Sequence, residues 1–155
     1  MLTFAQAYLR IRPYLGEREP SSLPYLTPLS DTTVRMTDPR HDAQTKSSMF
    51  RPSVLPQSSI YTFSHVFPPL TTQSDFFTKT TLPLIGDVLQ GQNALLFTYG
   101  VTNSGKTYTV QGGSREGSAG IVPRTLDVVF NSIEGLQGDG RVRFCLALPF
   151  RLGSY

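Results

Sequence analysis

A chain of 155 residues and 17.1 kDa has the length of one domain, which excludes a multi-domain machine within these residues. Apolar side chains make up 39% of it and charged ones 16%, a balance that argues against wholesale disorder. The formal charge of +3 comes from 14 basic and 11 acidic residues mixed along the chain, so no basic run typical of nucleic-acid binding is present. We therefore expect a globular chain that binds no nucleic acid.

The cellular compartment is indicated by cysteine content and by the N-terminus. Cys145 is the single cysteine, so no internal disulfide can form and a reducing compartment is expected. Its thiol is interpreted as a small buried apolar group, with a catalytic role as the alternative. No secretory signal is visible at the N-terminus, and no apolar run reaches the length that crosses a bilayer. The expectation is a soluble, cytosolic chain without a membrane partner.

Proline dominates the first half of the chain. Nine of the 12 prolines precede residue 70, amid serine and threonine, which favours short strands and loops over a long helix. Three strands are predicted by apolar and β-branched residues: Ala7–Arg12, ended by Pro13; Thr32–Met36; and Ser59–Phe67, closed by Pro68-Pro69. The remainder of this half is expected to be loop.

Helical spacing of apolar residues is clearer in the second half. Gln73–Gln90 is predicted to be helical, with a kink or a fresh first turn at Pro83 and a C-terminal cap at Gly91. A second helix is predicted from about Gly105, followed by a glycine-rich loop over 111–120. A third carries Pro123 near its start and ends before Gly135, with Leu126, Val129, Phe130 and Ile133 at helical spacing.

Two apolar runs in the same half are predicted to be strands. Asn93–Tyr99 is apolar on both faces, as expected of a central strand in a covered sheet, and Arg141–Leu148 has a similar composition. Because these strands alternate with helices, a covered, largely parallel α/β sheet is predicted for this half.

The turn after the first of these strands matches the pattern Gly-x-x-x-x-Gly-Lys-Ser/Thr in full. Its residues are Gly100, Val101, Thr102, Asn103, Ser104, Gly105, Lys106 and Thr107. Glycines let successive amide N–H groups turn inward around an anion, and the N-terminus of the following helix adds positive potential. Lys106 supplies a cation for the β- and γ-phosphates, and the Thr107 hydroxyl can ligate Mg²⁺. The alternative is a glycine turn between strand and helix, with the lysine solvated.

Three further segments accompany this loop, and each also has a purely structural interpretation. Arg10–Pro13 (Arg-Ile-Arg-Pro) can be an exposed strand with a terminating proline. Tyr61–Phe67 (Tyr-Thr-Phe-Ser-His-Val-Phe) can be an edge strand, and Gly120–Arg124 (Gly-Ile-Val-Pro-Arg) a loop and helix start. In this order, and together with Phe97–Thr109, these segments nevertheless resemble the kinesin motor head. The sequence of residues 91–107 is most similar to the mitotic kinesin-like subfamily active in cytokinesis.

That resemblance implies a fold, a set of site residues and a pair of cofactors. The fold is an α/β P-loop NTPase of kinesin type, with a central mixed sheet flanked by helices. Residues 100–107 would wrap the phosphates of ATP, with Lys106 and Thr107 positioning phosphate and Mg²⁺. Arg10 and Pro13 would flank the adenine, with Tyr108 where many kinesins have histidine; a tyrosine retains the stacking surface. Residues 112–120 would be the loop that interrupts the helix after the phosphate site.

The chain also departs from the family. The Ser- and Arg-rich switch I and the Asp-Leu-Ala-Gly switch II do not occur in the sequence. None of the acidic residues after the phosphate loop ends an apolar strand as a metal-binding carboxylate would: Glu116, Asp127, Glu134 and Asp139. With resemblance over about 6–148 and a divergent end at 149–155, the expectation for 1–155 is a partial motor domain, truncated before the switches and inactive alone.

Function follows from the same resemblance. It implies the ATP-binding portion of a microtubule motor, in which ATP hydrolysis drives movement in the intact protein. Tubulin would be the partner, with dimerisation through a stalk and location on the cytoskeleton, at the spindle or midzone. Two alternatives stay open: a P-loop NTPase of another class, whose GTPase form would need an Asn-Lys-x-Asp motif that is missing, and a non-enzymatic nucleotide-binding or interaction fragment.

Overall fold

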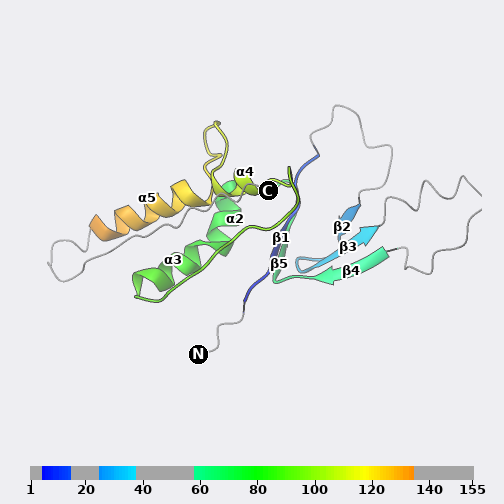
Figure 1. Ribbon diagram of the computed structural model, residues 1–155, viewed down its shortest axis with the longest axis horizontal. Coiled ribbons are helices and arrows are strands. Elements are labelled where there is room, and N and C mark those ends of the chain that lie inside the picture. Colours follow the sequence, from blue (N-terminus) through cyan, green and yellow to red (C-terminus); the bar gives the residue numbers. More distant parts are fainter. Residues whose placement is uncertain (1–4, 15–24, 38–57, 135–155) are drawn as a thin grey trace, which may run out of the picture.

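The computed structural model describes residues 5–14, 25–37 and 58–134 of the chain. Two short strands pair in parallel at its centre, β1 (Tyr8–Arg10) and β5 (His65–Phe67). An antiparallel sheet lies to one side of this pair, in the order β2 (Leu26–Pro28), β3 (Thr33–Thr37), β4 (Ser58–Thr62). The helices lie on the other side (Figure 1), namely α2 (Gln73–Thr80), α3 (Leu82–Leu89), α4 (Lys106–Val110) and α5 (Ile121–Glu134).

The strands of the first half differ from the predictions in two ways. The run predicted as one strand over Ser59–Phe67 is two, because the backbone leaves the antiparallel sheet at Phe63 and joins the parallel pair. Phe63 N donates to Thr32 O (2.8 Å), and the next amide, Ser64 N, donates to Ala7 O (2.7 Å). Strand β2 was predicted to be loop; it is three residues long and ends at Pro28, which is tolerated on an edge strand.

Helices α2 and α3 confirm the prediction that Pro83 interrupts the helical run over 73–90. Thr72 caps α2, since its side chain accepts a hydrogen bond from Asp75 N at 3.1 Å. Thr81 both ends α2 and precedes α3, and Pro83 occupies the first turn of α3, where a missing N–H costs nothing. The run ends as predicted at Gly91, which has a left-handed backbone.

Two apolar clusters hold the helices to the central strands. Phe67 of β5, Phe76 of α2 and Ile121 of α5 form the first, with Tyr8 and Leu96 packed against it. The second joins all three longer helices, through the buried residues Phe77, Ile85 and Val129. Helices α2 and α5 each contribute to both clusters, through Phe76 and Phe77 and through Ile121 and Val129, so these two helices link the strands to the helical layer.

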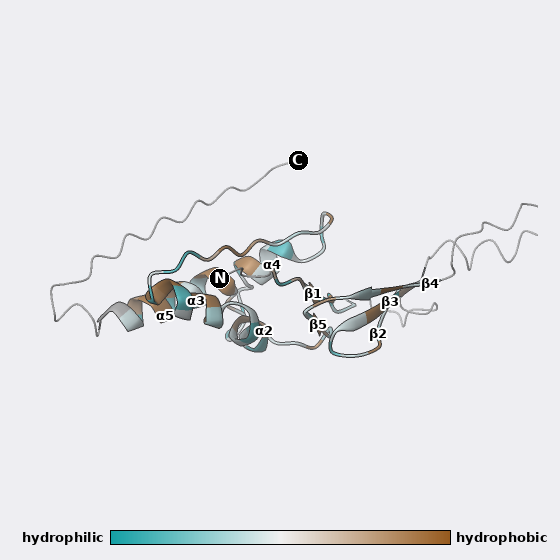
Figure 2. Cartoon of the chain, turned by 90° about the horizontal axis from the view of Figure 1, so that it is seen from below, coloured by the Kyte–Doolittle hydropathy of each residue, from teal (hydrophilic) through white to brown (hydrophobic). Residues whose placement is uncertain are grey.

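The strand predicted over Asn93–Tyr99 is not present. Within the described residues 68–134, strand-like pairing is confined to an isolated bridge between Gly112 and Ala119. Residues 93–99 are extended and alternate: Leu96 packs inward, whereas Leu95, Phe97 and Tyr99 are 82%, 79% and 96% exposed. Figure 2 shows this segment as a hydrophobic stretch of the connection between α3 and α4. The prediction of a strand covered on both faces is wrong here, because no backbone within the described residues pairs with this segment and one of its faces is exposed.

The predicted parallel sheet of the second half therefore has no counterpart in residues 68–134, and the predicted strand over Arg141–Leu148 lies outside the described residues. None of the helices in the described part of the chain combines the length and the apolar character that crossing a bilayer requires.

Candidate functional site

The loop over residues 100–107 connects the extended segment to α4. Gly105 is the residue before the helix and has a left-handed backbone, with φ of 102°. A side chain would be strained in that conformation, which accounts for the second glycine of the motif. Gly100 and Asn103 also have positive φ, at 155° and 65°. The predicted start of a helix at about Gly105 is confirmed, and the loop has the left-handed turns that a concave ring of amides requires.

Lys106 carries the positive charge of this loop. Its Nζ donates hydrogen bonds to Gly100 O at 2.7 Å and to Val101 O at 2.8 Å. The ammonium group is thus held inside the curve of the loop, beside the residue at which the loop begins. Helix α4 has five residues, so its dipole adds less than that of a long helix, and Lys106 adds a full positive charge beside it.

Two further side chains belong to this site: Thr107, the last residue of the loop, and Arg12, which contacts the loop from outside. Thr107 lies in the first turn of α4 with an exposed side chain. Arg12 Nη1 donates to the carbonyl oxygen of Asn103 and so ties the loop to the end of β1. No role for Arg12 could be predicted, because nothing in the sequence indicates which residue a surface arginine contacts.

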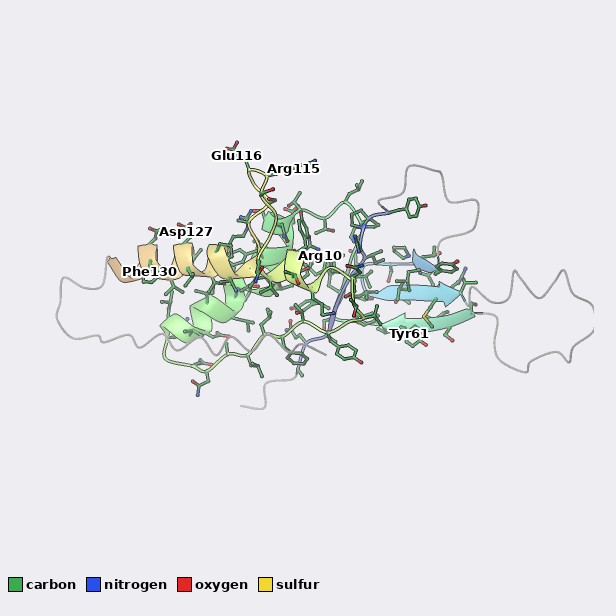
Figure 3. The ribbon with its side chains drawn as sticks, turned by 45° about the horizontal axis from the view of Figure 1, so that its top comes forward. Arg10, Tyr61, Arg115, Glu116, Asp127 and Phe130 are labelled. Carbon is green, nitrogen blue, oxygen red and sulfur yellow. The ribbon has the colours of Figure 1, made fainter. Side chains whose placement is uncertain are left out.

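Arg10 lies at the junction of β1, α2 and α4 (Figure 3). Its Nη1 donates to Gln73 Oε1 (2.7 Å) and to Thr109 Oγ1 (3.1 Å). The guanidinium carbon lies 4.8 Å from the ring centre of Phe76 and 5.6 Å from that of Tyr108. Burial lowers the pKa of the Arg10 guanidinium, and Tyr108 opposes that shift. Arginine nevertheless remains charged, so a cation stands against two aromatic rings.

The residues predicted to flank the adenine are partly brought together. Arg10 and Tyr108 are adjacent, and the Tyr108 side chain is 48% exposed and available to a ligand. Pro13 is exposed beyond the end of β1. Gln73 is part of the same junction, although the sequence analysis gave it no role beyond starting a helix. The Gln73 side chain forms hydrogen bonds with Arg10 and with the carbonyl oxygens of Tyr108 and Ser118.

The glycine-rich loop predicted over 111–120 is confirmed as a hairpin-like turn. Gly113 N donates to Ser118 O at 3.0 Å, and Gly120 N to Gln111 O at 3.2 Å. Arg124 of α5 holds the returning arm, with Nε donating to Ala119 O (2.8 Å) and Nη2 to Gly117 O (3.0 Å). Arg115 and Glu116 are exposed at the tip, which projects away from the helices (Figure 3).

None of the described acidic residues after the phosphate loop ends a strand, as predicted. Glu116 is in the loop, and Asp127 and Glu134 belong to α5; Asp139 lies outside the described residues. Asp127 is exposed and accepts a hydrogen bond from Asn131 Nδ2 at 3.3 Å. No group of three or more His, Cys, Asp or Glu suited to a metal occurs among the residues that the structure describes.

Comparison with known proteins decides the family. The family model described as the kinesin motor domain matches residues 10–147. The chain belongs to the kinesin motor domain family. Mouse kinesin-like protein KIF20A is 41% identical over 132 residues, and human kinesin-like protein KIF20B is 41% identical over 132 residues. Each match covers 84% of this chain, and 14% and 7% of the two relatives respectively. The chain therefore spans a small part of the relatives' length.

A solved structure titled kinesin 6 matches with a TM-score of 0.61 and 37% identity, over 81% of this chain and 28% of that one. The predicted fold class, a kinesin-type P-loop NTPase with a mixed sheet and flanking helices, is confirmed. The resemblance to the mitotic kinesin-like subfamily is confirmed as well. Membership of this family removes the alternative of a P-loop NTPase of another class.

Proposed function

We propose that this chain is the ATP-binding portion of a microtubule motor, and that ATP hydrolysis by the whole protein drives movement along microtubules. One observation carries the proposal: within a chain of the kinesin family, Lys106 is held in the curve of the 100–107 loop. A lysine there can exchange its two carbonyl contacts for phosphate oxygens, which bind an ammonium more strongly because they are charged.

ATP would be held at both ends of this site. Residues 100–107 would surround its phosphates with main-chain amides, and Tyr108 would offer its half-exposed ring to the base. Arg10 and Pro13 complete the proposed base-binding side. Phosphoryl transfer to water depends largely on positioning and charge stabilisation, which are the two properties that this loop supplies.

Kinesin motor domains bind their nucleotide with Mg²⁺, and the donor set of this loop fits that ion. Thr107 presents a hydroxyl oxygen in the first turn of α4, and Mg²⁺ prefers oxygen ligands combined with substrate phosphates. We assign Thr107 as the residue that holds the metal and Lys106 as the residue that stabilises the γ-phosphate. The metal would supply charge neutralisation of the phosphates when it is bound.

The partner that we propose is the microtubule, and the location is the cytoskeleton, at the spindle or midzone. In the whole protein, dimerisation would occur through a stalk. Residues 6–148 are proposed to form one portion of a motor domain, supported by the family match over 10–147.

Calorimetry and a turnover assay test the two parts of this proposal separately. Titration of the full chain with Mg·ATP and Mg·ADP is expected to release heat, and the absence of heat with both would overturn nucleotide binding. Phosphate release is then measured with and without microtubules. Little or no release is expected from residues 1–155 alone, because switch I and switch II do not occur in the sequence. A whole protein that binds Mg·ATP without stimulated release would favour the non-enzymatic nucleotide-binding alternative.

A further inference from the structure

Gln73 is a buried polar residue whose side chain joins three parts of the chain. It is the first residue of α2 and is 4% exposed. Its Oε1 accepts the hydrogen bond from Arg10 Nη1 (2.7 Å), and its Nε2 donates to Tyr108 O (2.6 Å). A longer contact of 3.4 Å runs from the same nitrogen to Ser118 O in the glycine-rich loop. A buried amide with both ends bonded fixes the groups that it contacts.

Tyr108 is held by this arrangement at two points. Gln73 bonds its main-chain carbonyl directly. Arg10, which Gln73 orients, lies 5.6 Å from the centre of its ring. The Arg10 guanidinium is further fixed by Thr109 and by the ring of Phe76, so it cannot turn away without breaking several contacts. Gln73 therefore controls both the backbone and the ring of Tyr108.

We propose that Gln73 is a positioning residue for the base of the nucleotide, and that it acts through Tyr108 and Arg10. This inference rests on the proposed function, because it assumes that the exposed face of Tyr108 meets the base. The side-chain hydrogen bonds of Gln73 reach Arg10, Tyr108 and Ser118, and none of them ends on residues 100–107. Loss of Gln73 should thus weaken binding less where the Tyr108 ring is absent, and Arg10, which Gln73 also orients, should account for the remainder.

A double-mutant cycle on the full chain tests this, with the dissociation constant for Mg·ATP as the readout. Gln73→Leu keeps the size of the side chain and removes both bonds, and we expect about tenfold weaker binding. In a Tyr108→Ala background the same change should weaken binding by about threefold or less, because one of the two groups through which Gln73 acts is gone and only Arg10 remains. Gln73→Glu is the second variant: it keeps the acceptor for Arg10 and loses the donor to Tyr108 O.

The outcomes separate this inference from the proposed function. If the unmodified chain binds no Mg·ATP, the proposed function fails. If it binds, and Gln73→Leu costs the same factor with and without the Tyr108 ring, Gln73 has a general structural role and the inference is wrong. Unchanged affinity in the Gln73→Leu single variant also overturns it. Loss of the folded state in both the Leu and the Glu variants, judged by circular dichroism, would likewise make Gln73 a structural residue.

Discussion

The ammonium group of Lys106 donates a hydrogen bond to the carbonyl oxygen of Gly100, six residues earlier, at 2.7 Å. The bond thus joins the C-terminal end of the loop, at Lys106, to Gly100, the residue at which the loop begins. The loop is consequently closed by a cation, and removing that cation changes its charge and its shape together.

Lys106→Ala should therefore weaken Mg·ATP binding by at least about 100-fold, because a charged hydrogen bond to phosphate and the closure of the loop are lost together. Equilibrium titration of the full chain with Mg·ATP measures this. Lys79→Ala is the control: Lys79 is an exposed lysine of α2, beside His65, and its removal should leave affinity unchanged. Equal affinities for the two variants would contradict the assignment of Lys106.

Two glycine substitutions should change stability in opposite directions. Gly112 has φ of 95°, and a Cβ there would lie 2.3 Å from Ser118 O, so Gly112→Ala should cost about 3 kcal/mol or more. Gly86 lies inside α3 with no atom within 4 Å of such a Cβ, and Gly86→Ala should stabilise by up to about 1 kcal/mol. Urea denaturation measures both. A tolerated alanine at 112 would mean that the hairpin does not have this backbone.

The alternation of residues 93–99 is tested by a pair of identical changes at neighbouring positions. Leu96 packs against the cluster of Phe67, Phe76 and Ile121, whereas Leu95 is 82% exposed. Leu96→Ala should lower the free energy of unfolding by about 2 kcal/mol, and Leu95→Ala by less than about 0.5 kcal/mol. Denaturant titrations of the two variants supply the comparison. A larger loss of stability for Leu95→Ala than for Leu96→Ala would mean that Leu95, and not Leu96, lies on the buried face of the segment.

A buried hydroxyl offers a stabilising substitution. Thr125 Oγ1 of α5 is buried without a hydrogen-bond partner among the described residues. Thr125→Val keeps the shape and removes the unpaired group, so stability should rise by about 1 kcal/mol. Thr80 is the matched control, because its buried hydroxyl donates to Phe76 O at 2.7 Å. Thr80→Val should lose about 1 kcal/mol, and a thermal melt of each variant should show shifts of opposite sign.

Local signals account for what could be predicted from the sequence. Pro83 and Gly91 mark the break and the end of the helical run, and the Gly-Lys-Thr sequence marks the phosphate loop and the helix after it. Proline acts through its missing backbone N–H and glycine through its access to positive φ, and both effects extend over only a few residues. They can therefore be read from the local sequence without knowledge of the tertiary structure.

The remaining features depend on contacts between distant segments. Residues 93–99 have the composition of a buried strand, but pairing requires a second backbone that composition does not reveal. The break at Phe63 arises because consecutive amides donate to Thr32 O and Ala7 O, which directly precede β3 and β1. Gln73 could not be recognised either, since its partners Arg10 and Tyr108 are 63 and 35 residues away.

The hairpin between α4 and α5 is fixed at its base and exposed at its tip. Gly112 pairs with Ala119, and the Arg124 side chain donates hydrogen bonds to Ala119 O and Gly117 O. These contacts at the base fix the spacing of α4 and α5, and the tip residues Arg115 and Glu116 take no part in them. Extra residues added at that tip would lengthen the excursion and leave the helices in register. Evolution and protein engineers alike can therefore vary the length of this turn without rebuilding the fold beneath it.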